Sequence, residues 1–178
     1  MKSNSPSPFK VNLHELPRRA GEMRSYHLEI AAPESIGTPM LSIKSGRLLE
    51  IDFKAEAVSD GVLISGQILS EAEGECGRCL EELKLEIDQE FRELFLYESR
   101  KSSEEDEDEL FSMDGDFADI ETPIRDAVVL SLPLNPLCKS DCKGLCSECG
   151  ERMEQLAPDH SHESVDPRWS GLAGWQPK

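Results

Sequence analysis

The chain has 178 residues, 38% of them hydrophobic, and a net charge of −17, which suits one domain with a modest core and appendages. It contains no apolar run close to the roughly 20 residues that a membrane-spanning helix needs, and its first ten residues lack the apolar stretch of a secretory signal. A protein that binds nucleic acid mainly through phosphates needs a basic face, and the net charge opposes that mode of binding. We therefore expect a soluble, cytoplasmic protein with no membrane partner.

The first half of the chain predicts a β-rich domain. Residues 1–8 are rich in serine and proline and are expected to form a disordered leader. Residues 9–97 carry the apolar and polar alternation of strands with one buried face, most clearly at 49–57. In chain order, this part predicts a short strand over 9–16, a strand over 24–30 and a loop at 33–39. A strand over 49–57 follows, then a return strand from 62 to 69 that leads on to Cys76, and a further strand from 83. Cys76 and Cys79 are then expected at the tip of a hairpin.

An acidic segment interrupts the pattern at residues 98–118. It contains an unbroken run of acidic residues, Glu104 to Glu109, and little apolar content. Like charges repel one another and bury no apolar surface, so this segment is predicted to be an extended, mobile loop.

A change of period marks a helix after this loop. Ile120, Ile124 and Val128 recur at helical spacing, and Pro123 suits a first helical turn. Asp119 or Thr122 can cap the helix, and the prolines at 133 and 136 are expected to end it. Residues 119–178 thus form this helix and a cysteine- and histidine-bearing segment packed on the same domain. The predicted fold is α+β: an antiparallel β-rich body, either an open sheet or barrel-like, with one helix and a C-terminal zinc-knuckle segment.

The most informative pattern is a set of potential metal ligands in four close pairs. All the cysteines of the chain belong to it, and the pairs are Cys76/Cys79, Cys138/Cys142, Cys146/Cys149 and His160/His162. Thiolate and imidazole are the ligands that zinc prefers in tetrahedral sites, so the set is sufficient for one or two structural zinc ions. Disulfides are the alternative for an even cysteine count, but they fit an oxidising compartment better. A thioredoxin-like redox role is less favoured, because the flanking sequence lacks the alternating strands and helices of that fold.

Sequence leaves the pairing of these ligands open. We prefer a zinc ribbon that joins Cys76/Cys79 to Cys146/Cys149, with Cys138, Cys142 and the histidines around a second ion, because two facing Cys-x-x-Cys turns form a recurring geometry. A second arrangement keeps the four C-terminal cysteines together and leaves the hairpin pair with the histidines. In a third, a single ion is bound and the remaining groups are free.

The ligand set indicates a structural metal. Catalytic zinc usually keeps an open position beside a general base, whereas sites with four protein ligands are closed. The sequence shows no Gly-rich phosphate loop, nucleophile elbow or His-Glu-x-x-His helix. A hydrolase is therefore the least favoured function, and no small-molecule substrate is expected.

Several motifs resemble one bacterial family. They are the turn Cys76–Leu80, the segment from Ile124 to Pro136 ending in Leu-Ser-Leu-Pro-Leu-Asn-Pro, the run from Leu137 to Gly150, and the late Asp-Pro-Arg-Trp at 166–169. Together they are similar to the YceD family, known as large ribosomal RNA subunit accumulation proteins, over about Phe9 to Leu172. The long acidic insert departs from shorter members of that family.

The resemblance implies a non-enzymatic factor of ribosome biogenesis that supports synthesis, processing or stability of large-subunit ribosomal RNA. Its expected partner is ribosomal RNA or a basic large-subunit ribosomal protein. Some relatives carry Cys-x-Cys where this chain has His160-Ser161-His162, which favours these histidines as ligands. Candidate binding residues outside the ligand set are Arg78, Lys139, Lys143, Arg168 and Trp169. The alternative is a zinc- or redox-responsive regulatory binding protein, in which the cysteine pairs sense oxidant or metal supply.

Overall fold

The computed structural model describes residues 7–97, 111–162 and 168. Its elements are β1 (Lys10–Asn12), β2 (Met23–Ala31), β3 (Ile36–Gly37), β4 (Leu41–Ile43), β5 (Leu48–Ala57), β6 (Gly61–Glu75), β7 (Glu82–Leu96), β8 (Phe117–Asp119) and the helix α1 (Glu121–Ser131). The α+β prediction, a β-rich antiparallel body with one helix, is therefore confirmed.

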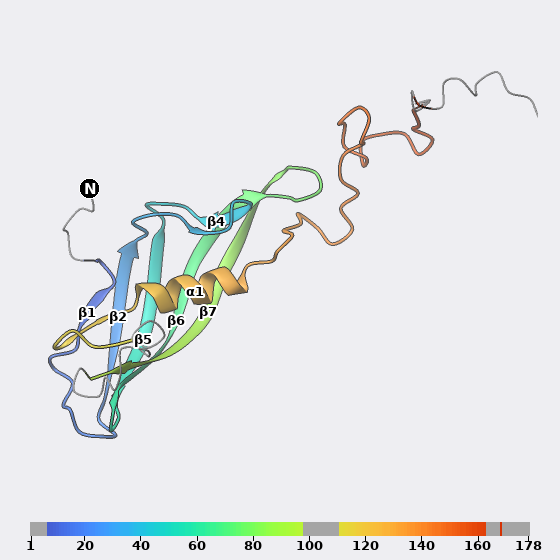
Figure 1. The fold of residues 1–178 in the computed structure, drawn as a ribbon. Coiled ribbons are helices and arrows are strands. Elements are labelled where there is room, and N and C mark those ends of the chain that lie inside the picture. Colours follow the sequence, from blue (N-terminus) through green and yellow to red (C-terminus); the bar gives the residue numbers. More distant parts are fainter. Residues whose placement is uncertain (1–6, 98–110, 163–167, 169–178) are drawn as a thin grey trace, which may run out of the picture.

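The main sheet is antiparallel and is built around β6. One edge of β6 pairs along its whole length with β7, and the other pairs first with β5 and then, near Gly74, with β4. Strand β2 pairs with β5, and β3 pairs with β4. Figure 1 shows α1 lying across one face of this curled sheet and the C-terminal segment leaving the end of the helix.

The core lies between the sheet and the elements on that face. Along β5, the residues Leu49, Ile51, Phe53, Ala55 and Ala57 are buried and alternate with polar residues, as the sequence pattern predicts. The same cluster includes Ile124 and Val128 of α1, and the N-terminal Phe9 and Val11. The short sheet of β1 and β8 adds Ala118 to the cluster.

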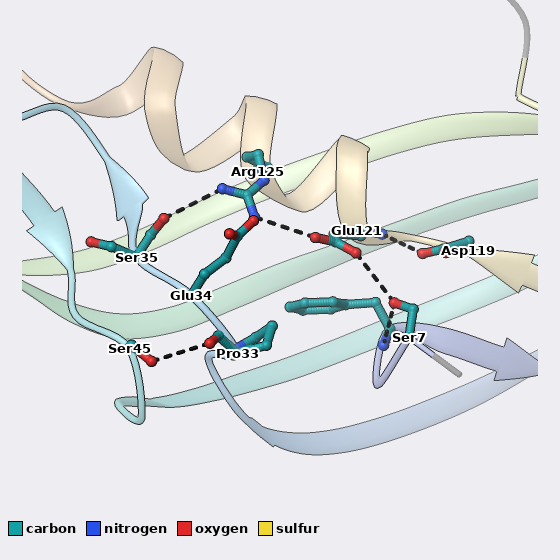
Figure 2. A network of polar contacts seen from close by, with 9 residues as sticks. Ser7, Pro33, Glu34, Ser35, Ser45, Asp119, Glu121 and Arg125 are labelled. Atoms are coloured by element: carbon teal, nitrogen blue, oxygen red, sulfur yellow. Dashed lines mark hydrogen bonds and ion pairs between the residues drawn. The ribbon is translucent and has the colours of Figure 1, made fainter. Parts of the chain in front are cut away.

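A polar network fixes the N-terminal half of α1 (Figure 2). The Arg125 guanidinium donates to Glu34 at 2.7 Å and to Glu121 at 3.2 Å, and also to the carbonyl of Ser35 at 3.4 Å. The Ser7 hydroxyl donates to the other carboxylate oxygen of Glu121 at 3.3 Å. The network therefore joins the helix to the segment before β3 and to the N-terminal strand region.

The start of the helix differs in detail from the sequence prediction. Ile120 is the N-cap residue, and no side chain caps it. The carboxylate of Asp119 instead accepts a hydrogen bond from the Glu121 amide at 3.1 Å. Pro123 lies in the first turn, where its missing N–H costs no hydrogen bond.

Several short elements were not predicted. The strand expected over 9–16 is limited to the residues of β1, and the expected loop at 33–39 contains β3. Of the predicted acidic loop, residues 98–110 lie outside the described residues, but 111–118 are ordered against the core. Met113 is buried there, and β8 pairs with β1. The expected leader at 1–8 also lies mostly outside the described residues.

Among the residues that the structure describes, no helix is both long and apolar enough to cross a membrane.

Candidate metal centre

The first ligand group forms at the tip of the β6–β7 hairpin. It contains Cys76, Cys79, Cys138 and Cys142, whose sulfur atoms all lie within 4.8 Å of one another, and we call it cluster 1. The Cys76 and Cys142 sulfurs are 3.8 Å apart, and those of Cys79 and Cys138 are 3.6 Å apart. Four sulfurs at about 2.3 Å from a tetrahedral zinc lie about 3.8 Å from each other. The four cysteines thus fit one zinc ion, and none of the cysteines is in a disulfide.

Cluster 1 is largely shielded from solvent. Cys76 has no exposed surface, and Cys79 and Cys142 are also buried, whereas Cys138 is exposed. The half-buried side chains of Leu83, Leu137 and Leu145 pack around the buried sulfurs.

The electrostatics of cluster 1 favour a cation at its centre. The backbone N–H groups of Cys138, Arg78 and Cys79 lower the pKa of the Cys76 thiol to about 6, against the opposing effect of desolvation. Desolvation and the three neighbouring thiols raise the pKa of Cys138 to about 12. Without a cation, the four thiols therefore cannot all ionise near neutral pH, because the negative charge of one thiolate disfavours ionisation of its neighbours. A bound divalent ion removes this conflict, as it does in thiolate zinc sites.

The second ligand group is Cys146, Cys149, His160 and His162, again within 4.8 Å, and we call it cluster 2. The Cys149 sulfur lies 3.6 Å from Nε2 of His160, which is close to the separation of about 3.6 Å expected for a sulfur and a nitrogen ligand of one tetrahedral zinc. The N–H groups of Cys149 and Glu148 and the His160 side chain lower the pKa of the Cys146 thiol to about 6. Cys149 and His162 are exposed, so this group is more open to solvent than cluster 1.

The two Cys-x-x-Cys turns have the same backbone hydrogen bonds. In the first, the Cys76 amide donates to the Glu81 carbonyl at 2.8 Å, and the Leu80 amide donates to the Cys76 carbonyl at 2.9 Å. In the second, the equivalent bonds join Cys146 to Glu151 at 2.7 Å and Gly150 to Cys146 at 2.9 Å.

This geometry requires a left-handed residue after the second cysteine of each turn. Leu80 has φ = 59° and Gly150 has φ = 74°. The repeated turn aims two sulfurs to the same side, as a zinc knuckle requires.

Backbone contacts hold the C-terminal segment against the hairpin. The amide of Gly77 donates to the Pro136 carbonyl at 2.7 Å, and the Arg78 guanidinium donates to the Cys142 carbonyl at 2.8 Å. A Cβ atom at Gly77 would lie 2.1 Å from Oδ1 of Asn135, so a larger residue there would have to displace the Asn135 side chain. These contacts place Cys138 and Cys142 beside the hairpin cysteines.

The preferred zinc-ribbon pairing is therefore wrong. The structure joins Cys76/Cys79 to Cys138/Cys142, and it joins Cys146/Cys149 to the two histidines. The segment that follows α1 contacts the hairpin through the Pro136 carbonyl. Cys138 and Cys142, the first cysteines of that segment, therefore lie beside the hairpin cysteines in cluster 1. The Cys146/Cys149 turn then lies beside the histidines that follow it in the chain.

Two of the candidate binding residues outside the ligand set have structural partners beside the clusters. Arg78 donates to Cys142, and Lys139 pairs with Glu154 at 2.7 Å. Lys143 and Arg168 are exposed, and Trp169 lies outside the described residues. An ion pair of Arg152 with Glu81, at 3.0 Å, links the second turn to the first and was not predicted from the sequence. The sequence signal for two equivalent turns was the shared pattern Cys-x-x-Cys-x-Glu, in which Glu81 and Glu151 have the same position.

Comparison with known proteins decides the family. The family model described as large ribosomal RNA subunit accumulation protein YceD matches residues 64–175, a region that includes most of β6, all of β7 and α1, and both clusters. The chain belongs to the YceD family. This confirms the resemblance that the cysteine-bearing motifs indicated.

Mycobacterial relatives extend the match over most of the chain. Uncharacterized proteins of Mycobacterium tuberculosis (strain H37Rv) and Mycobacterium bovis are each 40% identical over 167 residues, which cover 93% of this chain and 80% of the relative. An uncharacterized protein of Mycobacterium leprae is 33% identical over 168 residues, covering 93% of this chain and 76% of the relative. No solved structure matches the chain significantly. The YceD family thus provides a ribosome-related context, and the two clusters are a metal-compatible feature of this member.

Proposed function

We propose that the protein is a non-enzymatic ribosome biogenesis factor that supports the synthesis, processing or stability of large-subunit ribosomal RNA in the cytoplasm. Membership of the YceD family carries this proposal. Its partner is ribosomal RNA or a basic large-subunit ribosomal protein. The net charge of −17 is consistent with a basic protein partner, because opposite charges attract and steer association.

The two clusters contribute structure in this proposal. A zinc ion in cluster 1 would cross-link the β6–β7 hairpin to the segment that follows α1, and a second in cluster 2 would close the segment from Cys146 to His162. Structural zinc binds with roughly 10–16 kcal/mol of apparent free energy, more than a typical small domain has in total stability. Each ion can therefore order a segment that has little core of its own. With four protein ligands, neither cluster leaves the open position that catalytic zinc uses.

Depletion of the protein in its host, with re-expression of variants, tests the function. We expect depletion to lower mature large-subunit RNA and to increase its precursors, while small-subunit RNA changes less. Re-expression of the native chain restores the profile, and a Cys142→Ser variant restores it poorly because cluster 1 no longer has four ligands. An unchanged ribosome profile after depletion contradicts the proposal.

The exposure of cluster 2 supports a second candidate, a zinc- or redox-responsive regulator. Cys149 is exposed and the pKa of Cys146 is lowered to about 6, so these thiolates are more accessible to oxidant than the buried Cys76. This candidate predicts that mild oxidant releases metal from cluster 2 and changes partner binding. Sulfurs that stay metal-bound and unreactive under oxidant, measured by thiol titration of the native protein, would exclude it.

A further inference from the structure

The main sheet has a face that α1 does not cover. We call the side chains of β2, β5, β6 and β7 that point away from the core its outer face. On β7, for example, Glu86, Asp88 and Glu90 are exposed, whereas Ile87 between them is buried. The helix and the β1–β8 sheet contribute their buried residues to the core on the opposite face.

The outer face is acidic in a way that destabilises the isolated fold. Carboxylates lie directly opposite one another on paired strands at Glu29/Glu50, Glu71/Glu86 and Glu75/Glu82. Like charges in such cross-strand positions repel each other. Two cations compensate part of this charge. Lys84 pairs with Glu71 at 3.1 Å and with Glu73 at 3.4 Å, and Arg47 pairs with Glu71 at 2.8 Å and with Glu73.

Four other carboxylates on this face have no ion-pair partner in the part of the chain that the structure describes. Among the described residues, none forms an ion pair with Glu50, Glu75, Glu82 or Glu86. A bound partner that brings lysine or arginine side chains would therefore gain attraction that the free protein lacks.

Apolar side chains lie in hollows between these charges. One hollow, of about 400 Å³, is lined by Leu48 and Leu69 together with Glu50 and Glu86. Leu48 is 44% exposed and Leu69 is 38% exposed. The surface thus offers apolar contacts of the kind that protein interfaces use, inside a charged rim.

A second hollow, of about 420 Å³, continues this surface to the cluster 1 turn. It is lined by Met40 and Leu80 beside the carboxylates of Glu73, Glu75 and Glu82, and also by Lys44 and Lys84. The Leu80 side chain is 60% exposed. Leu80 also has a left-handed backbone, and the equivalent position of the second turn is occupied by Gly150. The left-handed backbone is strained for leucine, and the exposed apolar side chain is available for contact with a partner.

We propose that the outer face is the docking surface for a basic polypeptide segment that presents lysine or arginine side chains to the carboxylates and apolar side chains to the two hollows. This inference rests on the proposed function, in which a basic ribosomal protein is one of the possible partners, and it specifies where such a protein binds. RNA does not match this face, because its phosphates meet carboxylates. A second copy of the chain would oppose one acidic face with another, and a metal ion alone would leave the apolar hollows empty.

Peptide titration of the zinc-loaded full chain, followed by amide chemical shifts at physiological salt, tests the proposal. The probes are a synthetic peptide that alternates lysine and leucine and a matched peptide that alternates lysine and serine. We expect the first to shift amides around Leu48, Leu69 and Leu80, and the second to bind more weakly. Equal binding of the two peptides, or shifts confined to residues 132–162, would overturn the proposal.

Matched charge variants separate local contacts from net charge. The test variant is Glu50→Gln with Glu86→Gln, and the control is Glu22→Gln with Asp126→Asn, two exposed carboxylates away from the hollows. The test variant should weaken binding of the lysine–leucine peptide about three- to tenfold, with little change in the control. An equal loss in both variants would mean that only net charge matters, and it would overturn the proposal. Concentration-dependent dimerisation through this face, or binding of an RNA oligonucleotide to it, would also overturn it.

The same variants distinguish this inference from the proposed function. If depletion lowers large-subunit RNA and the Glu50→Gln, Glu86→Gln chain restores it fully, the family function stands and the docking surface is wrong. If depletion leaves this RNA unchanged, the proposed function fails, whatever the peptide titration shows. Loss of both peptide binding and complementation in the test variant alone supports both.

Discussion

Leu80 and Gly150 occupy equivalent positions in the two Cys-x-x-Cys turns, and both have positive φ, 59° and 74°. A left-handed backbone costs about 1–2 kcal/mol for a residue with a Cβ atom, whereas glycine adopts it freely. The first turn therefore carries strain that the second avoids.

This strain can be measured with substitutions at Leu80. Leu80→Gly removes both the strain and the exposed side chain, whereas Leu80→Ala removes most of the side chain but keeps the Cβ atom. We expect the free energy of unfolding of the zinc-loaded glycine variant to exceed that of the alanine variant by about 1 kcal/mol. Urea denaturation of the two variants provides the comparison, and an alanine variant that is equally or more stable contradicts the backbone argument.

Single ligand substitutions should separate the two clusters. Cys142→Ser removes one ligand of buried cluster 1, and we expect it to lose one zinc per chain and to lower the melting temperature of the whole domain, because the hairpin loses its cross-link. His162→Ala removes one ligand of exposed cluster 2 and should lose the other zinc with a much smaller effect on the domain. Elemental analysis and thermal unfolding check both variants. His14→Ala, at an exposed histidine outside the clusters, serves as the control and should keep the full zinc content.

The ion pair of Arg152 with Glu81 should couple the two turns weakly. Both side chains are partly exposed, at 33% and 48%, so solvent screens the interaction. We expect a coupling energy of about 0.2–1 kcal/mol in a double-mutant cycle of Glu81→Gln and Arg152→Met, decreasing as salt is added. A coupling that does not change with salt would indicate that the two side chains interact through packing.

The alternation of apolar residues made much of the sheet predictable. Residues 49–57 form β5, and the return strand and its partner form the hairpin that ends at Cys76, because one buried face imposes a period of two on each strand. The helix was equally clear, since Ile124 and Val128 both face the core. The three-residue β4 and β8 were missed, because so few residues carry no readable period.

The members of the two clusters were predictable, but their pairing was not. Residue type and close spacing identify every cysteine and histidine of the two clusters. Pairing instead depends on where the chain lies after α1, which is fixed by contacts such as the Gly77 amide with the Pro136 carbonyl. Such a long-range backbone bond leaves no periodic trace in the sequence.

Removing charge from the outer face should stabilise the protein. Glu75 and Glu82 lie directly opposite each other at the end of the hairpin. We expect Glu82→Gln to raise the free energy of unfolding by about 0.2–1 kcal/mol at low salt, with a smaller gain at high salt. Asp126→Asn, at an exposed position on α1, provides the control and should show little gain. Destabilisation by Glu82→Gln at low salt would show that this carboxylate has a favourable contact in the free protein.

Anomalous X-ray diffraction at the zinc absorption edge, from crystals of protein purified without added chelator, tests the two-cluster account most directly. Two zinc peaks per chain are expected, one bound by Cys76, Cys79, Cys138 and Cys142 and the other by Cys146, Cys149, His160 and His162. No peak, or a peak shared by Cys76/Cys79 and Cys146/Cys149, would contradict it.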